Sequence, residues 1–254
     1  MSFLDPVLNP VLQPLLNSSP FLVVLLLALV VSLLITLAYK FFSDQAKMKA
    51  LKEEQKAYQQ QMKELRSQPE KMMQMQKESM RKNMDYMKLS FKPMLFTMIP
   101  LFLFFGWMAD HLAFEPIFPG ETYSITATFA KGVTGDAELL VDEGTELLSE
   151  AVQQISDRTI TWRLKSTEGP HELNVMKGEQ EWAKSVLITT AVQYEKAVSP
   201  FPHADLENIQ IDYTTLRPAG PNFSLLGWKP TWLGWYVLFS IVFSIGLRKA
   251  LKVY

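Results

Sequence analysis

The chain has 254 residues, of which 48% are hydrophobic, and its 25 basic residues nearly balance its 26 acidic residues. It contains no cysteine, so no disulfide can stabilise any part of it. The near-neutral average conceals three uncharged apolar runs, which alternate with segments rich in charge. Because about 20 apolar residues suffice to cross a bilayer as one helix, we expect an α-helical membrane protein that also carries a water-exposed domain.

Residues 1–20 contain regularly spaced prolines among pairs of apolar residues. We expect this segment to lie at the membrane interface outside the cytoplasm, in a conformation that the sequence does not define. Residues 21–39, FLVVLLLALVVSLLITLAY, form the first predicted span. No basic region precedes this run and no small-residue cleavage pattern follows it, so we interpret it as a retained anchor rather than a signal peptide.

Residues 40–92 are predicted to form a cytoplasmic antiparallel coiled-coil hairpin between the first and second spans. Apolar residues in each half recur at alternating spacings of three and four, which is typical of a heptad seam. The first seam consists of Met48, Leu51, Gln55, Tyr58, Met62 and Leu65. The second consists of Met73, Met80, Met84, Met87 and Phe91, with Lys77 intruding.

Methionine is concentrated between residues 72 and 84, where it occupies five of thirteen positions. Ordinary seam packing accounts for Met80 and Met84, but Met72, Met73 and Met75 cannot all face one seam. The alternative is a flexible, polarizable surface that adapts to many apolar ligands, beside lysines that suit lipid headgroups or ribosomal RNA. The candidate contacts for a substrate or the ribosome are Met72, Met73, Met75, Lys77, Met80, Arg81, Lys82 and Met84.

Residues 93–110 and 230–247 are the second and third predicted spans. Small hydroxyl side chains recur on one face of a span, and Pro100 is expected to kink its helix. The hydroxyl side chains either line a mildly polar groove, or they simply allow close helix packing and bond to their own backbone. The candidate groove residues are Ser32, Thr36, Thr97, Pro100, Ser240 and Ser244, with Lys40 and Lys92 at the groove mouth. The absence of ionisable residues inside the spans argues against a charge-based ion path.

The distribution of basic residues predicts the orientation of the spans. Residues 40–92 contain thirteen lysines and arginines against seven acids, whereas residues 110–229 contain nine against eighteen. The tail, residues 248–254, adds three basic residues. We therefore expect residues 40–92 and the tail in the cytoplasm, and the N-terminus and residues 111–229 outside.

Residues 111–229 are predicted to form an extracytoplasmic domain resembling an antiparallel β-sandwich. Alternating strand patterns cover residues 123–129, 159–165, 172–177, 185–194 and 208–216, while residues 136–155 fit either strand or helix. The histidines, His111, His171 and His203, lack metal-ligand spacing. No nucleophile elbow, phosphate-binding glycine loop or paired-carboxylate motif is present. We therefore expect no metal, no cofactor and no enzymatic activity.

The order of these segments, with the methionine-rich hairpin and the stretch KLSFKPMLFTMIPLFLFFGW, resembles the YidC/Oxa/Alb membrane insertase superfamily. It is most similar to the compact three-span archaeal branch, which is related to the core insertase subunit of the ER membrane protein complex. The resemblance covers residues 20–110 and 230–254. It implies a multi-pass plasma-membrane insertase and chaperone in protein transport, whose groove, open to cytoplasm and lipid, helps nascent transmembrane segments enter the bilayer.

The resemblance also implies partners: nascent membrane proteins, the ribosome, membrane lipids, and a second membrane subunit or the Sec translocon, with no specific nucleic-acid sequence. Two features depart from the family. Bacterial members carry an arginine in the groove, whereas the spans here are uncharged, and a β domain replaces the extra helical hairpin. The competing interpretations are a membrane-anchored receptor and a structural tether, which would use the outer β domain and the coiled coil to bind partners.

Overall fold

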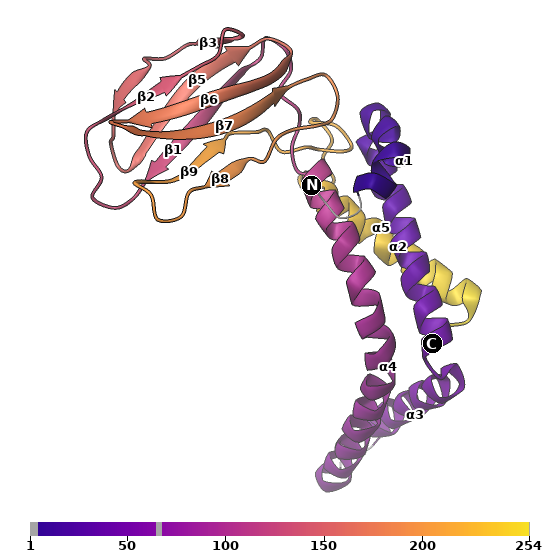
Figure 1. Cartoon of the computed structure of the whole chain (residues 1–254). Helices are drawn as coiled ribbons and strands as arrows, with labels where there is room; N and C mark the ends of the chain where they lie inside the picture. Colours follow the sequence, from indigo (N-terminus) through magenta and orange to yellow (C-terminus); the bar gives the residue numbers. More distant parts are fainter. Residues whose placement is uncertain (1–4, 65–67, 254) are drawn as a thin grey trace. The chain divides into compact units, whose positions relative to one another are not determined.

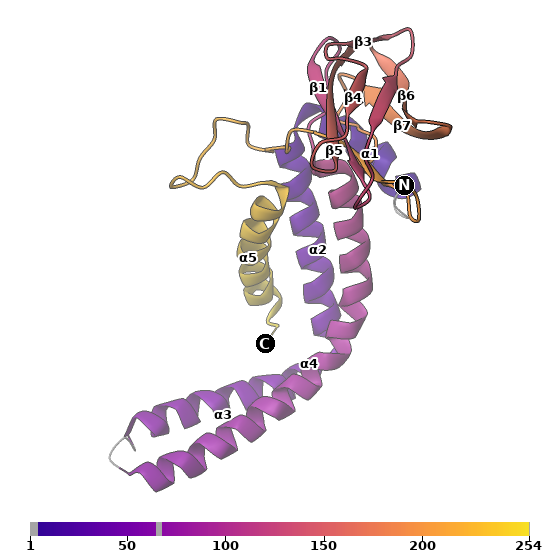
Figure 2. The same cartoon turned by 90° about the vertical axis from the view of Figure 1, so that its left-hand side faces the viewer.

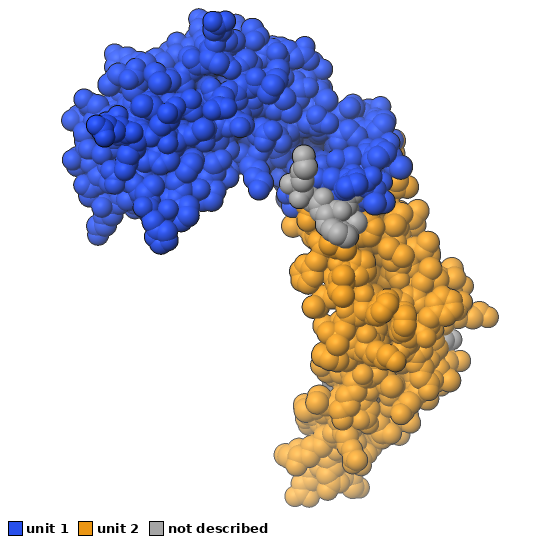
Figure 3. All heavy atoms as spheres, in the orientation of Figure 1, with its two compact units in different colours: residues 1, 5–20, 108–232 blue, residues 2–4, 21–107, 233–254 orange. Residues whose placement is uncertain are grey.

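The computed structural model describes residues 5–64 and 68–253, with the side chains of residues 63 and 64 excepted (Figure 1). The described residues form two compact units (Figure 3). One contains residues 21–107 and 233–253, and is helical. The other contains residues 5–20 and 108–232, and carries the β-strands.

Three helices in the described part of the chain are long and apolar enough to cross a membrane: α2 (Pro20–Phe42), α4 (Pro69–Leu112) and α5 (Trp232–Leu251). A helix suits this environment because it satisfies its backbone hydrogen bonds internally. These helices coincide with the three apolar runs of the sequence, although α4 also includes half of the hairpin. The helix α5 extends beyond the predicted span and includes Arg248 and Lys249, which were assigned to the tail.

The helix α3 (Gln45–Glu64) runs beside the first half of α4 as the other arm of a hairpin (Figure 2). The Asp44 carboxylate caps its N-terminus by accepting a hydrogen bond from the Lys47 amide at 3.0 Å. The arms are joined by an ion pair between Lys82 and Glu54 at 2.7 Å, and by a hydrogen bond from Gln55 to Asn83 at 3.1 Å.

The least exposed residues of α3 form the predicted first seam. Met48 and Leu51 are buried, and the remaining described members are partly buried: Gln55, Tyr58 and Met62. Because Gln55 bonds to α4, this row faces the other arm. The prediction for this row is therefore confirmed. Leu65 lies outside the described residues.

The predicted second seam is wrong. Its members are among the more exposed side chains of α4: Met73 57%, Met80 62%, Met84 52%, Met87 57% and Phe91 56%. The row that faces α3 contains Lys82 and Leu89 and continues at heptad spacing through less exposed residues, Met72, Met75, Ser79 and Tyr86. Two rows of α4 thus have heptad spacing. The prediction from sequence selected the row with the more apolar residues. The pairing uses the other row, as the ion pair between Lys82 and Glu54 on that row shows.

The helix α4 continues without a break from the hairpin into the membrane span and bends between these two parts (Figure 2). Pro93 and Pro100 both lie inside it. Each proline lacks the amide hydrogen that would bond to the carbonyl four residues earlier, which favours bending of the helix. One continuous but bent helix therefore connects the hairpin to the apolar core.

The helix α1 (Asp5–Ser18) forms in the N-terminal segment, with Pro10 and Pro14 inside it. It packs on the strand-containing unit through two hydrogen bonds to Val192. Gln13 Nε2 donates to the Val192 carbonyl at 3.1 Å, and the Val192 amide donates to Asn17 Oδ1 at 2.9 Å. The part of the predicted interfacial segment before Asp5 lies outside the described residues.

Residues 122–211 form two sheets whose neighbouring strands are antiparallel. The five-stranded sheet has the order β3-β5-β1-β9-β8, and the four-stranded sheet has the order β4-β2-β6-β7. The strands are β1 (Thr122–Phe129), β2 (Asp136–Leu140), β3 (Thr145–Leu147), β4 (Val152–Gln154), β5 (Thr159–Ser166), β6 (Gly169–Lys177), β7 (Gln180–Ile188), β8 (Val198–Pro200) and β9 (Leu206–Ile211). Residues 136–155, which fitted strand or helix, form three short strands.

The two sheets contribute to one hydrophobic cluster. The alternation predicted for residues 123–129 is confirmed, because the side chains of Tyr123, Ile125, Ala127 and Phe129 are all buried. Trp162, a member of this cluster, is fully buried, and its indole N–H donates to the Ala151 carbonyl at 3.0 Å. Full burial of one large apolar side chain contributes about 1.5–3 kcal/mol. In a domain without disulfides, this burial must supply most of the stability.

Two predicted strands end earlier than expected. β7 stops at Ile188 rather than continuing to residue 194, and β9 stops at Ile211 rather than at residue 216. In both cases the alternating pattern continues after the strand, but the backbone leaves the sheet to contact other parts of the unit. The Thr189 amide bonds to the Ile117 carbonyl, and the Leu216 amide bonds to the Ala113 carbonyl.

A buried polar network lies between β3, β5 and β6. Nδ1 of His171 is 2.9 Å from the Asp142 carboxylate, and its Nε2 is 2.8 Å from the Thr167 carbonyl. Gly144 makes room for the ring, because a Cβ atom there would stand 2.6 Å from Cε1 of His171. Burial by itself would raise the pKa of Asp142, but hydrogen bonds from His171 and Thr145 lower it below the usual 3.8.

This network predicts that acid destabilises the β domain. Because the folded pKa of Asp142 is lower than the unfolded value, its contribution is complete above about pH 4 and disappears as the pH falls through the folded pKa. Replacing Asp142 by asparagine should lower the free energy of unfolding of the β domain by about 1 kcal/mol, the typical net value of one hydrogen bond. The same change should make the stability of the domain less dependent on acid pH. Hydrogen exchange of the β6 amides in the full-length protein, followed as a function of pH, measures this stability.

Glu172→Gln is the matched control, because this carboxylate is exposed on the same strand. It should leave the acid dependence unchanged. If the β6 amides lose equal protection from hydrogen exchange in the wild type and in Asp142→Asn between about pH 5 and pH 2, Asp142 is not the source of the acid sensitivity.

Candidate functional site: two cavities and a methionine stripe

A cavity of about 350 Å³ lies between α2 and α5. Ser32 and Ile35 line it from α2, while Tyr236, Ser240 and Ser244 line it from α5. The structure therefore brings together three of the six predicted groove residues from two spans that are distant in sequence. The small serine side chains fill less volume than the isoleucines that share this lining, which leaves room for the cavity.

Several of the predicted hydroxyl groups bond to their own helices. Thr36 donates to the Ser32 carbonyl at 2.7 Å, and Thr97 donates to the Met94 carbonyl at 3.0 Å. Ser240 donates to the Val237 carbonyl at 2.9 Å while still lining the α2–α5 cavity. These bonds satisfy the hydroxyl hydrogens without any partner from another helix. For buried Thr36 in particular, the geometry agrees with the packing interpretation.

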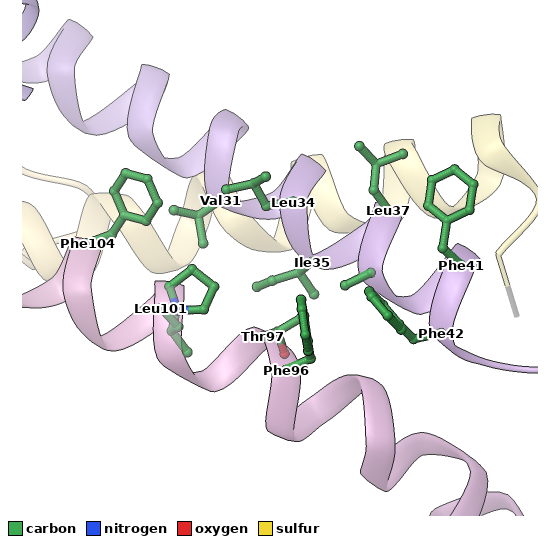
Figure 4. A pocket seen from close by; sticks show the side chains of 12 residues that line it. Val31, Leu34, Ile35, Leu37, Phe41, Phe42, Phe96, Thr97, Leu101 and Phe104 are labelled. Atoms are coloured by element: carbon green, nitrogen blue, oxygen red, sulfur yellow. The ribbon is translucent and has the colours of Figure 1, made fainter. Parts of the chain in front are cut away.

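Thr97 and Pro100 line a second cavity, of about 350 Å³, between α2 and α4 (Figure 4). Its walls are almost entirely apolar and include Phe42, Phe96 and Phe104. Ile35 lines both cavities, so the two spaces are neighbours along α2, one facing α5 and the other facing α4. Five of the six predicted residues are thus divided between two cavities and Thr36 lines neither, so the six do not line a single groove.

Aromatic contacts hold α5 against the other two spans. The ring of Phe21 in α2 stands 5.0 Å from Trp235 and 5.4 Å from Phe239, edge to face. Tyr236, which is buried, stands 4.9 Å from Phe105 of α4. Of these rings, Tyr236 also lines the α2–α5 cavity.

At the other end of α5, the guanidinium of Arg248 lies over the ring of Tyr39 in α2, 5.2 Å from its centroid. This cation–π contact was missed, because Arg248 was assigned to the tail. A signal was available in the sequence. Tyr236, Ser240, Ser244 and Arg248 recur every four residues and share one face of a helix. The serine face of α5 therefore ends in a cation beside α2.

We call Met73, Met80, Met84, Met87 and Phe91 the methionine stripe. These side chains are 52–62% exposed and follow heptad spacing along α4. With about 100° of rotation per residue, the stripe lies on the side of α4 that points away from α3. The same helix exposes Met94 and Met98 further on, inside the membrane span. An apolar surface therefore continues from the hairpin into the span.

The other predicted contact residues divide between two faces. Lys77 and Arg81 are exposed beside the stripe. Met72 and Met75 lie on the row that faces α3, together with Lys82, whose hydrogen bond to Glu54 raises its pKa above the usual 10.5. The expectation that Met72 and Met75 provide the open surface is thus reversed. Lys40 and Lys92, predicted at a groove mouth, are both exposed near the ends of their apolar runs.

A third cavity, of about 670 Å³, lies in the strand-containing unit between α1 and β7. Lys184 lines it and is only 2% exposed, although it occupies an inward position of β7. Its ammonium group donates to the Lys196 carbonyl and to the Ser199 hydroxyl. Burial lowers the pKa of Lys184 to about 8. The alternating pattern of the sequence alone did not identify this lysine as a buried residue.

Three apolar helices that enclose serine-lined and apolar spaces define a multi-span integral membrane protein. The chain belongs to the family described as integral membrane protein EMC3/TMCO1-like, whose model matches residues 5–135. This is an insertase family related to YidC, Oxa and Alb3, which confirms the resemblance seen in the sequence. The matched residues include α2, α3 and α4. Comparisons with curated proteins and with solved structures gave no match.

Proposed function

We propose that this chain is a membrane protein insertase that guides nascent transmembrane segments into the bilayer. The family is insertase-related. The observation that carries the proposal for this chain is the methionine stripe, an exposed apolar surface on a helix that runs unbroken into a membrane span. An exposed apolar surface on the polar arm of a hairpin is unfavourable in water, and a contiguous surface of this kind marks an interaction site.

The proposed orientation places the hairpin in the cytoplasm of a plasma-membrane protein, as a coiled coil, and the β domain outside, as a β-sandwich. The excess of basic residues over acidic ones between residues 40 and 92 supports this. So does the position of Arg248 and Lys249 in the last turn of α5, on the same side of the membrane.

The stripe acts first, by holding an emerging apolar segment. Methionine is flexible and polarizable, so a row of methionines adapts to clients of different sequence. Lys77 and Arg81 beside the stripe provide positive charge for lipid headgroups or for the phosphates of ribosomal RNA. The nascent membrane protein, the lipid bilayer and the ribosome are thus the proposed partners. A second membrane subunit or the Sec translocon is a further proposed partner, which completes the groove.

The α2–α5 cavity acts next, on the polar part of the client. A polar group that crosses a bilayer without a hydrogen-bond partner costs several kcal/mol. Serine oxygens on α5 and the water that they attract reduce this cost. Arg248, with Lys40 and Lys92, supplies positive charge for acidic client residues at the cytoplasmic end.

The last step is lateral release. The apolar client segment moves from the cavity into lipid, where the hydrophobic effect retains it. The neighbouring apolar α2–α4 cavity, with its phenylalanine walls, offers the client a surface similar to lipid. The proposed cycle needs no ATP, because burial of the client's apolar surface provides the driving force.

Site-specific photocrosslinking during synthesis of a single-span membrane protein tests this function. A photoreactive residue at Met80 or Met84 should crosslink to the nascent chain. The same residue at Glu78, which is exposed on another face of α4, should crosslink weakly. Equal yields from Met84 and Glu78 would reject a binding role for the stripe. No crosslinks at any position would favour a structural tether or a receptor instead.

A further inference from the structure

The segment that joins the β domain to α5 exposes an unusual run of residues, seen as the extended yellow loop before α5 in Figure 2. Every residue from Pro221 to Lys229 is exposed. The run includes large apolar side chains: Phe223 39%, Leu225 41%, Leu226 103% and Trp228 50% exposed. No acidic residue follows Asp212 in the chain, and Lys229 is the charge nearest to the apolar side chains.

The backbone of this segment forms a tight hairpin. The amide of Leu225 donates to the Trp228 carbonyl at 2.8 Å, and the amide of Trp228 donates to the Leu225 carbonyl at 3.0 Å. The two central residues, Leu226 and Gly227, have φ angles of 53° and 85°. Such two-residue turns favour asparagine followed by glycine, and a bulky residue at positive φ is disfavoured. A leucine at the tip therefore points to a requirement for an apolar side chain there.

The position of the hairpin in the chain indicates what covers it. The membrane span α5 begins at Trp232, four residues after Trp228. Four extended residues reach at most about 14 Å, so Trp228 lies close to the membrane surface. Tryptophan is enriched at this boundary, and a lysine beside it meets lipid phosphates. The apolar side chains, the single cation and the continuity with a span all fit a lipid surface.

We propose that the hairpin of residues 223–229 inserts into the membrane leaflet on the β-domain side, with Leu226 at its tip. The lipid covers Leu225, Leu226 and Trp228, while Lys229 remains among the headgroups. This contact is independent of the proposed insertase activity, since it needs neither the methionine stripe nor the α2–α5 cavity. It gives the connection to α5 a second attachment point at the membrane.

A single fluorescent label tests this contact, because the chain contains no cysteine. Leu226→Cys carries an environment-sensitive NBD group in the full-length protein, reconstituted at one copy per nanodisc of phosphatidylcholine and phosphatidylglycerol. We expect blue-shifted emission, about twofold quenching by spin-labelled lipid, and protection from aqueous iodide, as for an interfacial segment. Glu179→Cys, at the exposed turn between β6 and β7, is the matched control and should show the opposite behaviour.

A second variant separates insertion from a local effect of the label. Adding Trp228→Ser and Leu225→Ser to the labelled protein should restore iodide access at position 226, since both side chains are exposed and do not support the core. Iodide access at position 226 equal to that at 179 would overturn the proposal. Protection that appears only with two copies per disc would also overturn it, because the occupant would then be a second chain.

Discussion

Replacing Met80, Met84 and Met87 by glutamine is expected to weaken binding of an apolar client to the hairpin. These side chains are 52–62% exposed, so a client that covers them buries about half of each. At about 1 kcal/mol for each half-buried methionine, the triple variant loses roughly a hundredfold in affinity, since each 1.4 kcal/mol is a factor of ten. Binding of a labelled transmembrane peptide to the full-length protein in nanodiscs measures the loss, and insertion of a single-span client should fall with it.

The matched control replaces the same three residues by leucine. Leucine, glutamine and methionine have similar helix propensities, so both variants should keep the hairpin. The leucine variant should retain most of the binding, because it keeps the apolar area. If both triple variants lose binding equally, the flexibility of methionine is the property that matters. If neither loses binding, clients do not use the stripe.

Replacing Ser240 and Ser244 together by leucine is expected to slow insertion of a client with a polar terminal segment by about tenfold, the effect of roughly 1.4 kcal/mol on the barrier. The two leucines occupy part of the α2–α5 cavity and remove both serine hydroxyl groups that α5 contributes to it. The loss should be largest for clients whose translocated segment is polar or acidic. Initial rates of client insertion into reconstituted vesicles measure this slowing.

Val237→Leu with Val242→Leu is the control for this variant. These side chains lie on the same helix and are 45% and 65% exposed, away from the cavity lining. The control should insert clients at the wild-type rate. Slower insertion by both double variants would show that α5 tolerates no added volume, and an unchanged rate in the serine variant would reject the cavity as the route.

The two experiments examine successive steps. Loss of the stripe should reduce crosslinking and insertion together, because the client is not captured. Loss of the serines should leave crosslinking at Met84 intact and reduce insertion alone. This difference follows from the geometry, since the stripe lies on the hairpin part of α4 and the serines lie on α5.

The helices were predictable because their signals are local. An uncharged apolar run identifies a span regardless of its neighbours, and α2 matches its run within a few residues. The first seam of the hairpin also followed from spacing. The strands with clear alternation, such as β1 and β5, were predictable for the same reason, because burial on one face imposes a period of two.

Strand ends and the second seam were not predictable in this way. The alternation after Ile188 and Ile211 continues, but whether a strand remains in a sheet depends on its neighbours. Likewise, α4 contains two rows with heptad spacing, and only the partner α3 decides which one is covered. Met72 and Met75 lie on the row that faces α3, as the pairing of Lys82 on the same row with Glu54 shows.

The sequence by itself determined the three apolar helices, the hairpin, the strand-rich domain and the family. The helices, the hairpin and the strands depend on composition or periodicity over neighbouring residues, whereas the family came from a resemblance in segment order and in particular stretches of sequence. Only the tertiary structure decided that Ser32 meets Ser240 and Ser244 while Thr97 lines a different cavity, and that Arg248 lies over Tyr39. The physical reason is that a helix face has no partner until another helix packs against it, and side chains far apart in the chain then determine which residues remain exposed.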